Sequence, residues 1–282
     1  MSNQDFFAPA DLDQACALLA DEMTQPLAIA GGTDIMVRFN RHRRRRQETL
    51  VYLGKLGLDY IREEDGNVVL GAFAPLSEVA ASPLINHKLP LLAKACWEMA
   101  SPAIRNAATL GGNVVNNARH ADGVAALTAL DATVVVASTA GERTMAMSDF
   151  TATSKKEKLA GGGVVKHFVI TPLGPDENWA WEKLRQRKGE SRSVVSVAMR
   201  AKMQGGKCTA MRLVIGCMAP NPFVSKAATE LMVGQVPGAA LNKQVAEKVL
   251  SECTPASDAR ASAWYREKAT SALIERVLSQ LN

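Results

Sequence analysis

The stretch Leu27-Ala28-Ile29-Ala30-Gly31-Gly32-Thr33-Asp34 decides how this chain is interpreted. In it an apolar run stops at a glycine pair, and side chains that can hydrogen-bond follow at once. The same order recurs in Ala108-Thr109-Leu110-Gly111-Gly112-Asn113. Glycine permits positive φ and close approach of a ligand, and successive exposed N–H groups hold anions such as a diphosphate. The two motifs together predict one phosphate-bearing cofactor that is bound between them.

The residues around the first motif predict a strand, a glycine turn and a helix, in that order. Residues 27–30 are a short apolar run after Pro26, and residues 35–39 have the pattern of a helix that opens after the turn. The turn amides then lie at a helix N-terminus, where backbone N–H groups attract negative charge. The second motif is predicted to be a loop between helices at residues 89–99 and 124–130.

The rest of the chain predicts an α+β fold. Residues 148–163 are rich in Ser, Thr, Lys and Gly and mark a candidate subdomain boundary, beyond which an antiparallel sheet is expected. Gln204-Gly205-Gly206-Lys207 has the composition of a hairpin turn. Strands are expected at residues 49–53, 67–72, 132–136, 164–171, 179–185, 194–203 and 208–218, and further helices at residues 12–23, 76–80, 226–233, 241–252 and 261–281.

Length and composition bound the class of protein. The chain has 282 residues, of which 47% are apolar and 22% charged, as in an ordinary soluble protein of two or three domains. No apolar run reaches the roughly 20 residues that a membrane span needs, and residues 1–7 lack the features of a signal peptide, so we expect a cytoplasmic protein without a membrane span. The five cysteines are scattered without a CxxC pair, which argues against a disulfide framework, a zinc site or an iron–sulfur cluster.

Much of the positive net charge lies in one run, Arg41-His42-Arg43-Arg44-Arg45-Arg46. Such a cluster can bind nucleic acid or an acidic partner. No aromatic residue interleaves with the run, and no nucleic-acid fold signature surrounds it. The sequence therefore favours a solvated basic loop over a phosphate or partner contact, and it predicts no binding of nucleic acid.

Ordered segments along nearly the whole chain give it a resemblance to a known family. AGGTD at residues 30–34 and IRNAATLGGNVVN at residues 104–116 resemble the two flavin motifs of the FAD-binding subunit in the xanthine dehydrogenase and carbon monoxide dehydrogenase family of molybdenum hydroxylases. EKLRQRKG at residues 182–189 is similar to a basic segment of the carbon monoxide dehydrogenase branch. The segments similar to the C-terminal hairpin and the closing helix of the family are VVSVAMRAK at 194–202, MRLVIGCMAPNP at 211–222 and SDARASAWYREKATSALIERVL at 257–278.

The resemblance implies a particular domain organisation. Two N-terminal α+β subdomains of the FAD-binding (PCMH) type, at residues 1–55 and 56–165, would hold FAD in the cleft between them. A C-terminal domain at residues 166–282 would be a three-stranded antiparallel sheet flanked by helices.

The resemblance also carries the flavin contacts of the family onto this chain. Backbone amides of the first motif would hold the diphosphate and ribityl chain, although the same glycines equally suit a tight strand–helix turn. Asn113 suits a diphosphate oxygen or a ring edge, and equally a left-handed turn. Lys183, beside Trp181, matches a position near the isoalloxazine, where a cation stabilises the anionic reduced ring, and an exposed strand lysine explains it equally well. The expected FAD contacts are Leu27, Ala28, Ile29, Ala30, Gly31, Gly32, Thr33, Asp34, Ala108, Thr109, Gly112, Asn113, Asn116, Asp122, Ile170 and Lys183.

One stretch departs from the family pattern. In Asn116-Asn117-Ala118-Arg119-His120-Ala121-Asp122 the pair Ala118-Arg119 stands where the family has Ser-Pro, so the hydroxyl contacts of that loop are missing. The planar guanidinium of Arg119 suits a phosphate instead. Asp122 matches an acidic residue near the adenosine or ribityl part, and it also suits the N-cap of the next helix. A histidine such as His120 is more often a surface-loop residue than a catalytic base, and we expect no catalytic side chain and no metal ligand.

The sequence as a whole predicts the FAD-binding electron-transfer subunit of a multi-subunit molybdenum hydroxylase. As the resemblance implies, a large partner subunit holds molybdopterin, a small one holds [2Fe-2S] clusters, and electrons pass from the clusters through FAD to NAD or another acceptor. The complex would be a dimer of heterotrimers. The alternatives are a free-standing flavin oxidase and a scaffold subunit that has lost flavin.

Overall fold

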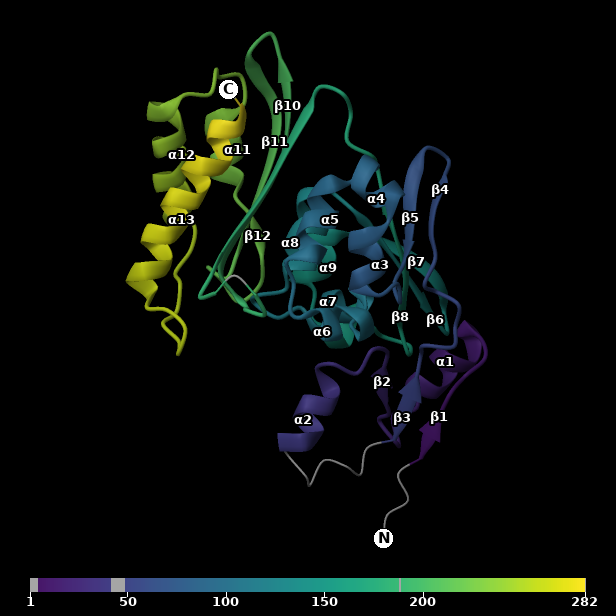
Figure 1. Cartoon of the computed structure of the whole chain (residues 1–282). Helices are drawn as coiled ribbons and strands as arrows, with labels where there is room; N and C mark the ends of the chain where they lie inside the picture. The colour runs from purple at the N-terminus through teal and green to yellow at the C-terminus, as the bar shows by residue number, and fades with distance from the viewer. Residues whose placement is uncertain (1–4, 42–48, 188, 282) are drawn as a thin grey trace.

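The computed structural model describes residues 5–41, 49–187 and 189–281, and Figure 1 shows them as layers above a small N-terminal sheet. A five-stranded sheet, a layer of helices, a four-stranded sheet and a last layer of helices follow one another across the molecule. The basic run predicted at residues 41–46 lies, apart from Arg41, outside the described residues.

The N-terminal subdomain is a three-stranded parallel sheet with two helices. Its strand order is β1-β3-β2, and the predicted strand, glycine turn and helix are confirmed as β2, the turn at residues 30–34 and α2. Asp11 begins the first helix because its side chain accepts a hydrogen bond from the Gln14 amide. The elements are β1 (Phe6–Phe7), α1 (Leu12–Leu19), β2 (Leu27–Ile29), α2 (Ile35–Arg41) and β3 (Leu50–Tyr52).

The second subdomain is an antiparallel sheet in the order β4-β5-β8-β6-β7, with helices packed on one face. The strand predicted at residues 164–171 forms, but it lies between β5 and β6 and not in the C-terminal sheet, because its partners are Val68–Gly71 and Thr133–Ala137. The elements are β4 (Ile61–Glu64), β5 (Asn67–Gly71), α3 (Leu76–Ala81), α4 (Pro83–Lys88), α5 (Pro90–Trp97), α6 (Pro102–Ala107), α7 (Leu110–Asn116), α8 (Asp122–Ala129), β6 (Thr133–Ser138), β7 (Gly141–Ala146), α9 (Met147–Ala152), α10 (Lys155–Lys158) and β8 (Val164–Ile170).

The prediction of a loop at the second glycine motif is wrong. Gly111 and Gly112 lie in the first turn of α7, and α6 precedes it directly. Two side-chain caps explain the helices: Ser101 accepts from the Ile104 amide, and Thr109 accepts from the Gly112 amide at 3.1 Å. The caps outweigh the low helix propensity of the two glycines.

The C-terminal domain is a four-stranded antiparallel sheet in the order β12-β11-β10-β9, so the expected three strands are corrected to four. The fourth strand, which pairs with Val214 and Ile215, has only two residues. A strand of two residues is too short to show an alternating pattern in the sequence. The predicted hairpin is confirmed, with Gln204 opposite Lys207 and positive φ at Gly205 and Gly206. The elements are β9 (Glu177–Arg185), β10 (Ser193–Gln204), β11 (Lys207–Gly216), β12 (Phe223–Val224), α11 (Lys226–Met232), α12 (Ala239–Leu250), α13 (Ala263–Leu278) and the 3₁₀ helix η2 (Ser279–Leu281).

Helix α8 joins the two larger parts of the molecule. All its residues are buried, because it packs against α5, α7 and α9 on one side and against β10 and β11 on the other. Its small residues, Gly123, Ala125, Ala126 and Ala129, allow this close packing on every face. Along β10, Val197 and Met199 face the cluster under α12 and α13, whereas Ala198 between them faces the core around α8. No helix in the described ranges is long and apolar enough to cross a membrane.

The buried cation of α13 gives a prediction about stability. Arg266 is 1% exposed, and its Nη2 lies 2.8 Å from Oδ1 of Asp258. Partial burial alone would raise the pKa of Asp258, but the amides of Arg260 and Ala261 and the Arg266 charge outweigh it and lower the pKa to about 2. Because this pKa is depressed in the folded chain, the stabilisation is complete above the unfolded pKa of about 4 and is lost as pH falls toward 2.

Asp258→Asn should lower the free energy of unfolding by about 2 kcal/mol at pH 7, because Arg266 keeps its charge without a counter-ion. The difference from the wild type should narrow as urea unfolding is repeated from pH 4 toward pH 2. Asp59→Asn, at an exposed position, is the matched control and should leave the unfolding free energy within about 0.5 kcal/mol. If the unfolding free energies of the wild type and Asp258→Asn differ by the same amount at all pH values, the depressed pKa of Asp258 is contradicted.

Candidate functional site

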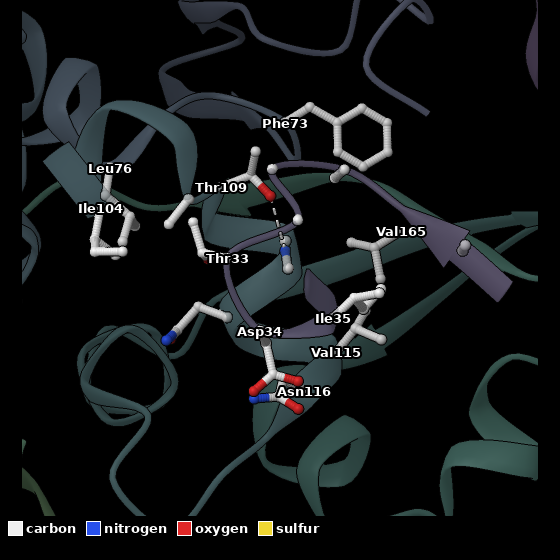
Figure 2. Close-up of a pocket in the computed structure, with 18 of the residues that line it drawn as sticks. Thr33, Asp34, Ile35, Phe73, Leu76, Ile104, Thr109, Val115, Asn116 and Val165 are labelled. Carbon is white, nitrogen blue, oxygen red and sulfur yellow. Dashed lines mark hydrogen bonds between the residues drawn. The ribbon is translucent and has the colours of Figure 1, made fainter. Parts of the chain in front are cut away.

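A cavity of about 660 Å³ opens between the subdomains. The β2–α2 turn, α6, α7, the turn before β8, and β9 with the segment that follows it all contribute to its walls. Figure 2 shows Thr33, Asp34, Thr109 and Asn116 among the residues that line it. Its volume lies within the range of about 300–1,000 Å³ that is usual for small-molecule and cofactor sites.

The first glycine turn offers unpaired amides to this cavity. Within the described ranges, no acceptor is found for the N–H groups of residues 31–34, all of which line the cavity. Gly32 has φ +70°, the left-handed region that favours glycine, and its carbonyl accepts the Met36 amide as α2 begins. Successive unpaired amides at a cavity wall are of the kind that can bind an anion.

Glycine is also required here because two subdomains touch through their backbones. A Cβ at Gly31 would lie 1.8 Å from the carbonyl oxygen of Ala107, at the end of α6. Across the cleft, Gly162 has φ +69°, and its Cβ would lie 2.0 Å from the carbonyl oxygen of Cys16 in α1. Residues larger than glycine at 31 or 162 would push the subdomains apart, so these two contacts set the width of the cleft.

The second glycine motif contributes differently. The Gly111 amide donates to the carbonyl of Ala72 at 2.7 Å, the Leu110 amide to that of Ala74 at 3.2 Å, and the Gly112 amide to Thr109 Oγ1 at 3.1 Å. A Cβ at Gly111 would lie 2.6 Å from the Ala72 carbonyl oxygen. The amides of Leu110, Gly111 and Gly112 are all paired, so this motif packs α7 against the turn that follows β5 and forms a wall of the cavity. The unpaired amides belong to the first motif.

Most of the residues predicted to contact FAD meet at this cavity. Ile29 and Ile170 do not line it: Ile29 packs with Phe39 and Leu50, and Ile170 is fully buried in the main core. Asn113 lines it, and its Oδ1 is buried without a hydrogen-bond partner in the described part of the chain. The predicted residues that line the cavity are Leu27, Ala28, Ala30, Gly31, Gly32, Thr33, Asp34, Ala108, Thr109, Gly112, Asn113, Asn116, Asp122 and Lys183.

Sequence reasoning missed the apolar walls of the cavity. Phe73, Leu76, Ile104 and Val165 project around its interior (Figure 2). In the sequence they are ordinary apolar residues, so no local signal marks them as part of a cavity. The triple glycine at residues 161–163 is the one signal that was available, since glycine so close to a strand often marks a close backbone approach.

A buried ion pair closes the end of the cavity nearest the C-terminal sheet. Lys183 Nζ lies 2.6 Å from Asp122 Oδ2, and the two side chains are 1% and 3% exposed. Ser193 Oγ donates to Asp122 Oδ1 at 2.6 Å, and Lys183 also donates to the carbonyl of Glu98 at 3.1 Å. Trp181 is 1% exposed and donates through Nε1 to the Glu98 carboxylate at 3.1 Å, so it is a core residue. This network ties α8 and α5 to β9.

The two unusual residues before Asp122 are separated by the fold. His120 lines the cavity, and burial followed by the charge of Arg192 lowers its pKa to about 4, so its ring is neutral at pH 7. Arg119 is not among the lining residues, and its backbone carbonyl accepts the Cys217 amide. The structure therefore gives no support to a contact between Arg119 and a phosphate in this cavity.

Cations gather at the edge of the cavity beside α2. Arg38 Nε lies 3.2 Å from Asp34 Oδ2, and both side chains are about half exposed. Partial burial and then the charge of Arg38 lower the pKa of Lys155, while Asp34 opposes them. Within the described ranges no cluster of His, Cys, Asp and Glu side chains could hold a metal ion. Arg38 and Lys155 therefore bring two positive charges to the edge of the cavity beside the turn at residues 31–34.

Two family models together match almost the whole chain. The FAD binding domain in molybdopterin dehydrogenase matches residues 2–172, and the CO dehydrogenase flavoprotein C-terminal domain matches residues 179–281.

Individual relatives agree with these models. The nicotinate dehydrogenase FAD-subunit of Eubacterium barkeri is 34% identical over 83% of this chain and 81% of the relative. Carbon monoxide dehydrogenase of Hydrogenophaga pseudoflava, in a solved structure that lacks the Mo-pyranopterin moiety, superposes with a TM-score of 0.91 at 26% identity, covering 98% of this chain and 96% of the other. Quinoline 2-oxidoreductase of Pseudomonas putida 86 gives a TM-score of 0.89 at 27% identity, with 99% and 96% covered.

The contact between Gly31 and Ala107 yields a prediction about stability. Gly31→Ala should lower the free energy of unfolding by about 3 kcal/mol, because the new methyl group meets a backbone oxygen that cannot rotate away. Gly189→Ala is the control, since a Cβ there has no atom within 4 Å. Urea unfolding of both variants is the measurement, and equal stability of Gly31→Ala and wild type would refute the close contact.

Proposed function

The chain belongs to the family of FAD-binding subunits of molybdopterin dehydrogenases, and we propose that it binds one FAD in the cavity between its subdomains. It is an oxidoreductase subunit of the type found in carbon monoxide and xanthine dehydrogenases. The observation that supports this site best is the run of unpaired amides at residues 31–34 in the cavity wall.

The residues at the cavity fit an FAD molecule. The amides of Gly31, Gly32 and Thr33 would hold the diphosphate, with the Thr33 hydroxyl as a further donor. Lys155 and Arg38 add positive charge near this turn, which favours a dianionic group. Apolar side chains such as Phe73 and Val165 would cover the adenine ring and exclude water from it. The remaining predicted contacts that line the cavity, from Leu27 to Lys183, complete the proposed site.

We propose that the chain works within a complex. FAD, when bound, would accept electrons that arrive from [2Fe-2S] clusters of a small partner subunit and release them to NAD or another acceptor, while a large partner subunit holds molybdopterin. The relatives named as medium chains of carbon monoxide dehydrogenase support such a division of labour. A dimer of heterotrimers is the proposed assembly. This chain's own residues bind and orient the cofactor.

Gly32 offers a direct test of the cofactor site. Gly32→Val should weaken FAD binding at least about a hundredfold, because a branched side chain at φ +70° is strained and displaces the neighbouring amides. Gly57→Val is the matched control: Gly57 has φ +64°, a Cβ there meets no atom within 4 Å, and Gly57 does not line the cavity. Isothermal titration calorimetry with FAD measures the affinity of both variants. Unchanged affinity in Gly32→Val would refute the site.

The proposed complex is tested by purification of the native assembly. We expect FAD, molybdenum and iron to co-purify with this chain, and FAD to remain on the chain when the partner subunits are removed. An isolated chain that oxidises an organic substrate unaided would instead indicate a free-standing flavin oxidase. A chain that neither carries nor takes up FAD would indicate a flavin-free scaffold.

A further inference from the structure

Lys183 and Asp122 neutralise each other in the cavity wall. Both oxygens of Asp122 are engaged, one by Lys183 at 2.6 Å and the other by Ser193 at 2.6 Å. The Lys183 ammonium also donates to the Glu98 carbonyl at 3.1 Å, so two of its three N–H groups are used within the protein. A ligand in the cavity therefore meets a neutral pair at this position.

His120 lies at the same end and adds no charge. Its pKa of about 4 leaves the imidazole neutral near pH 7, with burial as the main cause and Arg192 as the next. His120 can donate or accept a hydrogen bond there, but it cannot supply the cation that Lys183 fails to present.

Arg192 is the cation that remains at this end. It is exposed, lines the cavity, and directly precedes β10. No carboxylate in the described part of the chain lies within 4.0 Å of its guanidinium. Arg260, whose charge also reaches His120, is instead paired with Asp258 at 3.4 Å.

The two parts of the cavity differ in chemistry. The pyrimidine edge of an isoalloxazine carries several acceptors and one N–H donor, so it suits a polar wall. The apolar lining from the first two subdomains includes Leu19, Pro26, Leu53, Phe73 and Val165. The polar lining beside the C-terminal sheet includes His120, Asp122, Lys183, Glu190, Ser191 and Arg192, and Glu190 forms no ion pair with Arg192 in the described part of the chain.

We propose that Arg192, and not Lys183, is the cation that this chain presents to the pyrimidine edge of the bound isoalloxazine, where it favours the reduced over the oxidised ring. This inference rests on the proposed function, because it assumes FAD in the cavity. Lys183 then has a different role: it positions β9 against α8 through Asp122.

Three variants test the proposal. Arg192→Gln removes the charge, Arg192→Lys keeps it, and Lys207→Gln removes one charge from the tip of the β10–β11 hairpin, away from the cavity. Arg192→Gln should reduce the preference for reduced over oxidised FAD about tenfold, which for a two-electron couple is about 30 mV toward more negative potential. Sulfite addition to the bound flavin should weaken by a similar factor. The reduction potential of bound FAD in Arg192→Lys should stay close to the wild-type value, and that in Lys207→Gln should equal it.

A second readout needs no flavin. In the FAD-free chain, NMR titration of His120, assigned with His120→Gln, should give a higher pKa in Arg192→Gln than in the wild type, and no change in Lys207→Gln. The inference would be overturned if Arg192→Gln binds FAD but has the wild-type reduction potential and the wild-type pKa of His120. An equal shift of potential in Lys207→Gln would overturn it as well. A wild-type chain that takes no FAD would overturn the proposed function itself.

Discussion

The whole site depends on one backbone contact, that of Gly31 with the end of α6. A Cβ at residue 31 would lie 1.8 Å from the Ala107 carbonyl oxygen, so the first glycine turn rests directly on the backbone of the second subdomain. Ala108 and Thr109 follow at once, so the same contact fixes the free amides of the turn beside the N-cap of α7. Gly162 makes the equivalent contact with α1 on the other side. With no side chain at either point, the width of the cleft is determined by rigid backbone, and the side chains above it are left to form its walls.

The two glycine motifs look alike in the sequence but have different roles in the structure. The residues next to each motif determine its role. Residues 31–34 follow a strand end and keep their amides unpaired, so they can hold an anion. Gly111 and Gly112 follow Thr109, whose hydroxyl caps a helix, and their amides are used to build that helix and dock it on Ala72. A cofactor held between them would thus be bound through hydrogen bonds by one motif and confined by the other.

Features that depend on neighbours in sequence could be predicted, and features that depend on distant contacts could not. The α+β class, the strand and helix around residues 27–39 and the hairpin at 204–207 follow from local patterns and turn chemistry. The capped glycine helix α7 and the two-residue β12 were missed, because each is decided by a few hydrogen bonds that carry no periodic signal. Phe73 and Val165 look like core residues in the sequence, and only the packing of β5 and β8 places them at a cavity. The family resemblance supplied most of the remaining lining residues, whereas Ile29 and Ile170 face the protein core.

The charges of the cavity explain why an anionic ligand would complete it. Partial burial and the neighbouring Arg38 lower the pKa of Lys155, which means that the ligand-free cavity disfavours its own positive charge. A diphosphate on the amides of residues 31–34 would reverse that balance, since a nearby anion stabilises the protonated ammonium. The ligand would thus favour protonated Lys155, and loss of that proton at high pH would weaken binding. The same ligand would touch walls from all three parts of the chain, so its binding energy would also add to the stability of their packing.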